Sequence, residues 1–238
     1  MSTMQLFDDK TSLAYAAARQ AVNILHATIE KKGRAVWVLA GGSTPLLAYK
    51  IIAGEYRDAL DWTKVTVIIG DERIGPLDNP DNNWHTIDQV LGVLPTSKIR
   101  PRSDHSAEYA ASSYQQQLQS LPKTSSGLPC LDLLWLGVGE DGHTLSLFPQ
   151  HPGILPTNRL VIPVHDSPKP PADRISLSLR ALTGAKSAMI LTSGTDKQPA
   201  VTAALHNGHS PIALAAGIIE THKGKVDWFI DYDAAPTD

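Results

Sequence analysis

Short apolar runs alternate with longer amphipathic segments along the chain, and this alternation predicts the order of its strands and helices. The apolar runs have the length of buried strands and cover residues 4–7, 34–40, 65–69, 131–136, 160–164, 187–191 and 226–230. The segments with helical spacing or helix-forming composition cover residues 9–32, 46–53, 84–91, 107–121 and 198–205. Because strands that alternate with helices are typical of parallel sheets, we expect one three-layer α/β domain over residues 1–238, with a mostly parallel, Rossmann-like sheet flanked by helices.

Proline and local alternation modify this picture in three places. Residues Ile175–Leu179 alternate as an antiparallel or edge strand does, so we expect a small antiparallel extension. The prolines between residues 149 and 156 exclude a helix of useful length there. Pro45, in contrast, suits the first turn of a helix, and we expect Ser43 or Thr44 to be the N-cap of that helix.

The composition excludes several classes of protein. With 42% hydrophobic residues, the chain has enough apolar surface to build a core, and it is neither disordered nor collagen-like. The net charge of −3 gives no reason to expect nucleic acid or an anionic membrane as a partner. No signal peptide and no run of about 18 apolar residues is visible. The single cysteine, Cys130, fits a reducing compartment, so we expect a cytoplasmic protein that is a monomer or a homodimer.

Polar, glycine-containing turns follow three of the predicted strands, and the carboxyl ends of parallel strands meet at one edge of a sheet. The first turn is Gly41-Gly42-Ser43-Thr44, at the start of a helix. Free N–H groups and the helix dipole make such a start suitable for a phosphate, although an ordinary capped helix could begin in the same way. No Gly-Lys-Ser/Thr follows, so nucleoside triphosphates are not expected.

The second turn begins with three charged residues, Asp71-Glu72-Arg73, directly after a buried strand. A run of charges is often a solvated loop, but here no spacer carries these residues away from the sheet edge. We expect Arg73 to neutralise an oxyanion or a phosphate, and Asp71 to accept hydrogen bonds from sugar hydroxyls. Arg174 and Lys197 also stand beside strand or helix ends, where a basic residue contributes to an anion site only if a phosphate lies nearby.

The third turn, Gly137-Val-Gly-Glu-Asp-Gly142, matches the dinucleotide-binding pattern literally. That pattern requires a helix after its last glycine, and the downstream prolines exclude one, so we do not expect a dinucleotide. The turn instead delivers Asp141 and His143 to the carboxyl end of a strand, where a histidine can exchange protons near neutral pH. We expect His143 to be a catalytic base. His206 and His209 lack further ligands and suitable spacing, so no metal site is expected.

These motifs, in this order, resemble those of the 6-phosphogluconolactonases, which share a superfamily with the glucosamine-6-phosphate isomerases. The resemblance covers nearly the whole chain. It rests on residues 39–45, on Gly70–Arg73 with Asp81–Asn83, and on residues 136–149. Weaker support comes from residues 170–176, 194–197 and 228–231. It implies a hydrolase that acts on 6-phospho-D-glucono-1,5-lactone, a small sugar-phosphate lactone, without a cofactor, in the second step of the oxidative pentose phosphate pathway.

The resemblance also implies roles for individual residues. His143 becomes the general base for the attacking water, with Asp141 orienting it, and Arg73 becomes the active-site arginine. The phosphate pocket falls on Gly41, Gly42, Ser43 and Thr44, with Arg174 and Lys197 as its cationic partners. Asn83 falls where the family has an asparagine in its cleft.

One departure from the family pattern changes an expectation. Glu140 stands where a proline is common, and a carboxylate beside Asp141 is expected to raise the pKa of His143. Two alternatives to the lactonase remain open. In the glucosamine-6-phosphate deaminases the histidine is followed by a Phe-Asn-Glu-Pro segment, whereas this chain has Ser146-Leu-Phe-Pro149, without an acid. The other alternative is a sugar-phosphate sensor without catalysis.

Overall fold

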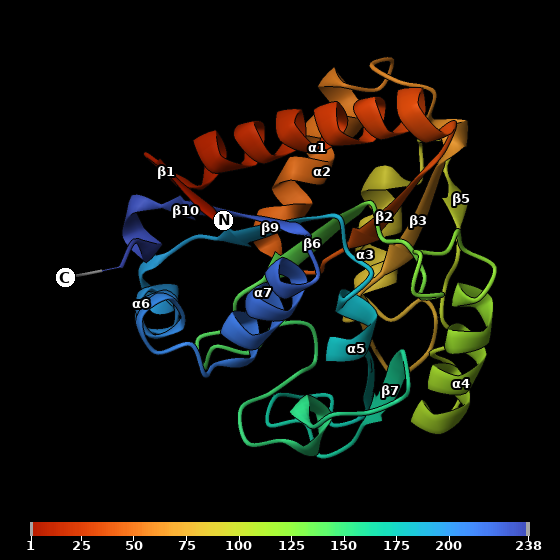
Figure 1. Cartoon of the computed structure of the whole chain (residues 1–238), viewed down its shortest axis with the longest axis vertical. Coiled ribbons are helices and arrows are strands. Elements are labelled where there is room, and N and C mark those ends of the chain that lie inside the picture. The colour runs from red at the N-terminus through yellow and green to blue at the C-terminus, as the bar shows by residue number, and fades with distance from the viewer. Residues whose placement is uncertain (1, 237–238) are drawn as a thin grey trace.

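A computed structural model describes residues 2–236 and contains a seven-stranded, entirely parallel sheet (Figure 1). Its spatial order is β1-β10-β9-β6-β2-β3-β5. The strands are β1 (Thr3–Phe7), β2 (Ala35–Leu39), β3 (Val65–Ile69), β5 (Ser97–Lys98), β6 (Leu133–Gly137), β9 (Ser187–Thr192) and β10 (Lys225–Asp231). This sheet confirms the predicted Rossmann-like class. The short strand β5 was not predicted.

The order of the strands places a topological switch point between β2 and β6. From β2 the chain builds outward through β3 to β5, and it then returns to β6 and builds in the opposite direction. The register pairs Trp37 with Leu133 and Val38 with Leu134 across the switch. Ligands of open α/β sheets bind outside the carboxyl ends of the strands at such a point. The turns that follow β2 and β6 are the two glycine-rich motifs of the sequence.

A second sheet, of three antiparallel strands, lies at the edge of the main sheet where the carboxyl ends of its strands meet. Its order is β4-β8-β7, with β4 (Asp71–Arg73), β8 (Arg174–Leu177) and β7 (Val161–Val164). This sheet confirms the predicted antiparallel extension, but β8 is its central strand and not an edge. The interpretation of residues 71–73 as a turn is wrong: they form a strand, because β8 supplies a hydrogen-bonding partner that is distant in sequence.

Helices cover both faces of the main sheet, with α1 (Lys10–Lys32) and α2 (Ser43–Glu55) on one face and α5 (Leu179–Leu182) and α7 (Pro211–Thr221) on the other (Figure 1). The remaining helices are α3 (Asn83–Leu91), α4 (Ala107–Leu118) and α6 (Gln198–Asn207). The sequence pattern did not predict α7, because its residues are apolar at nearly every position and show no polar face. No helix within residues 2–236 is long and apolar enough to cross a membrane.

The predicted ends of α1 are correct, whereas the predicted N-cap of α2 is wrong. Asp9 caps α1 in a capping box with Ser12, and Gly33 ends this helix in the left-handed conformation. Helix α2, however, begins at Ser43, so neither Ser43 nor Thr44 is its N-cap. The N-cap is Gly42, with φ of +105° and no side chain to occupy the first N–H groups. The start of α2 is therefore open to a ligand.

Two buried tyrosines complete the backbone hydrogen bonding at the carboxyl ends of β2 and β3. Strand β5 pairs with β3 only at Thr66 and Val67, so Ile69 lies beyond its reach. The Tyr114 hydroxyl accepts from the Ile69 N–H at 2.8 Å and donates to the Ile69 carbonyl at 2.9 Å. The Tyr49 hydroxyl makes the same two bonds with Ala40, both at 3.0 Å. Each tyrosine thus fixes the residue from which a cleft turn departs.

We expect Tyr114→Phe to lower the free energy of unfolding by about 1–3 kcal/mol, because it leaves a buried N–H and carbonyl without partners. Urea denaturation measures this loss. Tyr109→Phe on the same helix is the matched control, because Tyr109 is exposed and its hydroxyl makes no hydrogen bond with the described residues. Equal stability of the two variants would contradict the role given to the Tyr114 hydroxyl.

Candidate active site

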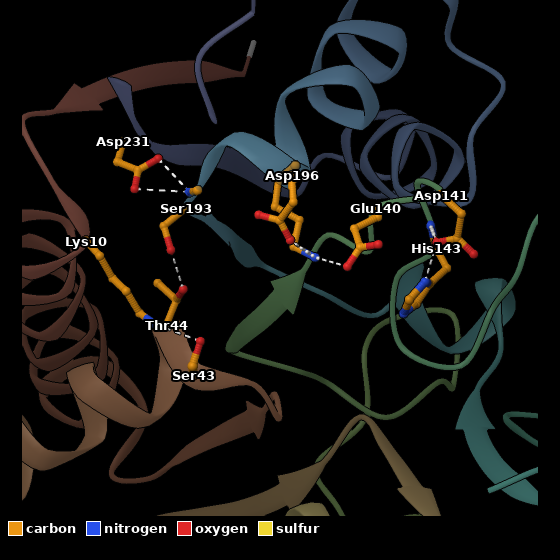
Figure 2. A network of polar contacts seen from close by, with 11 residues as sticks. Lys10, Ser43, Thr44, Glu140, Asp141, His143, Ser193, Asp196 and Asp231 are labelled. Carbon is orange, nitrogen blue, oxygen red and sulfur yellow. Dashed lines mark hydrogen bonds and ion pairs between the residues drawn. The ribbon is translucent and has the colours of Figure 1, made fainter. Parts of the chain in front are cut away.

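The carboxyl ends of β2, β3, β6 and β9 open into one cleft of about 820 Å³. Ten of the eleven predicted site residues line it, namely Gly41, Gly42, Ser43, Thr44, Asp71, Arg73, Asn83, His143, Arg174 and Lys197. The eleventh, Asp141, does not line the cleft but contacts Nδ1 of His143. Figure 2 shows polar contacts of this region, from Lys10 and Ser43 to Asp141 and His143. The switch point therefore brings together segments that are far apart in sequence.

The backbone around His143 holds its imidazole at the end of β6. A Cβ atom on Gly139 would lie 2.0 Å from Nδ1 of His143, so only glycine allows the ring to fold back over this turn. Gly142 has φ of +80°, which glycine adopts without strain. The other side of the imidazole packs on Phe148, with ring centroids 4.7 Å apart. No helix follows Gly142 directly, which agrees with the rejection of a dinucleotide site.

Asp141 fixes the orientation of the His143 ring. Its Oδ1 lies 2.5 Å from Nδ1 and also accepts the His143 backbone N–H at 3.2 Å. A carboxylate on Nδ1 selects the tautomer that leaves Nε2 without a proton, and Nε2 has no hydrogen-bond partner within residues 2–236. Burial lowers the pKa of His143 below 6.5, although the hydrogen bond and charge of Asp141 oppose this shift. The ring is thus neutral at pH 7, as a base must be.

The expected effect of Glu140 on His143 is wrong. The pKa of His143 is lowered and not raised, because burial outweighs the carboxylates that face the ring, which are Asp141 and Asp71. The Glu140 side chain instead pairs with Lys197, at 3.5 Å (Figure 2). The position of Glu140 next to Asp141 in the sequence therefore suggested the wrong direction for the pKa shift of His143.

Asp71 and Asn83 form a buried polar pair beside the cleft. The Ser146 hydroxyl donates to Oδ2 of Asp71 at 2.7 Å, and the Asn83 amide donates to the Asp71 carbonyl at 3.1 Å. The Asn83 side chain occupies the space in which a Cβ of Gly41 would lie, 2.0 Å from its Oδ1. Gly41 therefore lets α3 approach the end of β2.

The carboxylate of Glu72 lies wholly inside the protein and joins β4 to the start of α3. It accepts the backbone N–H groups of Arg73, Asn83 and Trp84, each at 2.8 Å. Burial raises the pKa of Glu72 to about 7 against the lowering effect of these three bonds, and the charge of Asp71 raises it further. Glu72 is 0% exposed, so it holds Arg73 and Asn83 in place but does not face a ligand.

The start of α2 forms the other end of the cleft. Lys10 donates to Oγ of Ser43 at 2.7 Å, and Thr44 and Ser193 share a hydrogen bond of 2.8 Å (Figure 2). Asp231 accepts the N–H of Gly194, at 3.0 and 3.2 Å to its two oxygens, and so anchors the turn after β9. Hydroxyls, free N–H groups and a lysine ammonium thus converge, which is the donor set that a phosphate requires.

The three predicted cations line the cleft but differ in their contacts and in their burial. Arg73 donates to the Asp81 carbonyl, and Lys197 pairs with Asp196 at 3.0 Å. Arg174 is 4% exposed, lies over the Phe148 ring, and donates to carbonyls in residues 169–171. Burial lowers the pKa of Arg174. Its contacts place it near the His143 ring, because both side chains pack on Phe148.

The sequence patterns missed several residues of the cleft, including Lys10, Lys169, Ser193 and Asp231. Lys10 and Lys169 belong to an ordinary helix start and to a proline-rich loop, so no local pattern marks them. Ser193 stands directly before Gly194 in the turn after β9, and this polar, glycine-containing strand end was the available signal.

Comparison with known proteins agrees with this geometry. Residues 8–228 match the family model described as glucosamine-6-phosphate isomerases/6-phosphogluconolactonase. The chain belongs to this family. A 6-phosphogluconolactonase from Streptomyces coelicolor is 37% identical over 95% of this chain and 91% of its own length. One from Mycobacterium tuberculosis is 32% identical over 98% and 97%, respectively.

Solved structures support the same relationship. The 6-phosphogluconolactonase from Trypanosoma brucei aligns with a TM-score of 0.86 at 26% identity, over 98% of this chain and 97% of that one. The enzyme of the same name from Leishmania guyanensis gives the same TM-score, identity and coverage. The family fold therefore extends through both sheets of this chain.

We expect the pKa of His143, followed by NMR of its Cε1–Hε1 group, to lie below 6.5 and to fall further in Asp141→Asn. Burial disfavours the imidazolium, and the substitution removes the carboxylate that favours it. His165 is an internal control, because its hydrogen bonds to Asp173 and Glu108 raise its pKa above 6.5. A rise of the His143 pKa in Asp141→Asn would contradict this account of the pair.

Proposed function

We propose that this protein hydrolyses 6-phospho-D-glucono-1,5-lactone to 6-phospho-D-gluconate, the second step of the oxidative pentose phosphate pathway. The observation that carries the proposal is the placement of a neutral, carboxylate-oriented histidine in the same cleft as an open helix N-terminus. The 6-phosphogluconolactonase names of relatives at 32–37% identity support it. The substrate is a small molecule, and no step requires a cofactor.

The chemistry begins with a water molecule next to His143. Nε2 takes a proton from the water as its oxygen attacks the lactone carbonyl carbon, and the carbonyl electron pair moves onto the carbonyl oxygen. When the tetrahedral intermediate collapses, the bond from this carbon to the ring oxygen breaks. The imidazolium returns its proton to the ring oxygen, which becomes the C5 hydroxyl. The new carboxylic acid loses its proton to solvent at neutral pH.

In the proposed site, one end of the cleft binds the phosphate and the other end holds the reacting carbonyl. The start of α2, with Gly41, Gly42, Ser43 and Thr44, binds the phosphate, and Lys197 and Arg174 supply positive charge. This binding energy, made far from the carbonyl, holds the lactone against His143. Arg174 has a second function in this proposal, because its guanidinium also orders the loop at residues 169–171.

Polar side chains near the reacting end complete the proposed site. Asp71 and Asn83 bind sugar hydroxyls, and Arg73 stabilises negative charge on the substrate. Nε of Arg73 is buried and has no hydrogen-bond partner among the described residues, which favours a guanidinium that is completed by a ligand nearby. Glu72 fixes the backbone of both Arg73 and Asn83.

Glucosamine-6-phosphate deamination fits this site less well. The family members that deaminate follow their histidine with a Phe-Asn-Glu-Pro segment whose glutamate relays protons. The corresponding segment here, Ser146-Leu-Phe-Pro149, has no acid and places Phe148 where the glutamate would stand. Incubation with glucosamine 6-phosphate should therefore release no ammonia, and measurable release would favour the deaminase.

We expect His143→Ala to lose roughly two to four orders of magnitude in kcat for lactone hydrolysis, because the general base is removed. The rate is measured above the spontaneous hydrolysis of the lactone. Calorimetric affinity for 6-phosphogluconate is the control, and it should persist because the phosphate site is intact. Full activity of this variant would exclude His143 as the base, and a sensor without catalysis would show binding but no turnover in the wild type.

We expect Lys197→Ala mainly to raise KM, by roughly tenfold, because it removes a charge from the phosphate end and leaves His143 unchanged. Lys197 tests this end better than Arg174, whose loss would also disorder a loop. Steady-state kinetics with the phosphorylated lactone give both constants. A fall in kcat at constant KM would place Lys197 at the reacting end instead.

A further inference from the structure

Five cationic side chains line the cleft, and one of them has no partner for its charge. Lys10, Arg73, Arg174 and Lys197 each donate to a hydroxyl, a carbonyl or a carboxylate. The ammonium of Lys169 makes no hydrogen bond or ion pair with any residue in the range 2–236. Lys169 is partly buried and lies in the loop between β7 and β8.

The backbone of Lys169 is held more firmly than its side chain. Its carbonyl accepts from Nη2 of Arg174 and from the Ser167 hydroxyl, both at 2.8 Å. Its N–H donates to the same hydroxyl at 3.3 Å. Since Arg174 is itself buried against Phe148, the loop is anchored to the wall that also supports His143. Because the backbone of Lys169 is anchored and its ammonium has no partner among the described residues, the ammonium is available to bind an anion.

Two observations place Lys169 on the same side of the cleft as His143. It lines the cleft together with His143. Its carbonyl accepts from Arg174, whose guanidinium lies over the same Phe148 ring that the His143 imidazole contacts. Its positive charge also disfavours the imidazolium of His143, in addition to burial.

We propose that Lys169 is a further catalytic residue, whose ammonium binds the lactone carbonyl oxygen and stabilises the negative charge that forms on it. This role rests on the proposed function. As water attacks, the carbonyl electron pair moves onto the oxygen next to the ammonium, and no proton is transferred from Lys169. After the ring opens, the same ammonium faces the product carboxylate. An unpaired cation is suited to this step, because it breaks no existing ion pair to stabilise the transition state.

The position of Lys169 has a second consequence for the base. A positive charge near His143 disfavours the imidazolium, and so adds to the effect of burial in keeping the ring neutral. Asp141 and Asp71 act in the opposite direction. Removing the charge of Lys169 is thus expected to raise the pKa of His143 while it lowers the rate of the chemical step.

The test uses Lys169→Met, which keeps the length of the side chain and removes its charge. We expect kcat for the phosphorylated lactone to fall roughly a hundredfold to a thousandfold, in the range of a lost oxyanion donor. Inhibition by inorganic phosphate should stay as in the wild type, because the phosphate end is unchanged. The pKa of His143, measured by NMR without ligand, should rise. Lys169→Arg, which keeps the charge, should recover much of the rate and restore the His143 pKa.

Lys31→Met is the matched control, because it removes the same charge from an exposed lysine in the last turn of α1, outside the cleft. It should leave all three measurements as in the wild type. Equal kcat for Lys169→Met and Lys31→Met would overturn the role of Lys169. Weaker inhibition by phosphate with normal kcat would also overturn it, and would assign Lys169 to the phosphate end. A wild type that does not hydrolyse the lactone would instead overturn the proposed function.

Discussion

The buried carboxylate of Glu72 is the interaction on which the geometry of the cleft depends most. A carboxyl group in the interior is costly unless donors replace its water, and here the N–H of Arg73 in β4 and the N–H groups of Asn83 and Trp84 at the start of α3 do so. The same bonds set the positions of Arg73 and Asn83, and Asn83 in turn fills the space that Gly41 leaves. One side chain thus connects the turn after β2, the strand β4 and the helix α3.

The main sheet imposes a second constraint, since its strands end where the site needs flexible turns. Tyr49 supplies backbone partners to Ala40, just after β2, and Tyr114 supplies them to Ile69 on the side of β3 that β5 does not reach. The turns that form the cleft therefore leave from rigid points. Such support places loops accurately without extending the sheet into the cleft.

Charge is distributed unevenly between the two ends of the cleft. The start of α2 offers N–H groups, hydroxyls and Lys10, all of which suit a dianionic phosphate. At the opposite end, burial lowers the pKa of His143, and the positive charge of Lys169 acts in the same direction. The two carboxylates, Asp141 and Asp71, act in the other direction, while the hydrogen bond to Asp141 orients the His143 ring. These two environments are the ones that the proposed function requires of a cleft that binds a sugar phosphate.

The sequence by itself determined the alternation of strands and helices, the three strand-end motifs and the candidates His143, Ser43 and Thr44. These features depend on local apolar periodicity and on glycine and proline, which act within a few residues. Only the tertiary structure decided that Glu72 is buried, that residues 71–73 form a strand, that Ser146 bonds Asp71 75 positions away, and that Lys10 reaches Ser43 across 33. It also showed that the ammonium of Lys169 has no partner within residues 2–236 and that burial lowers the pKa of His143. The physical reason is that burial and charge pairing depend on which distant segments the sheet brings together, and no local pattern encodes this.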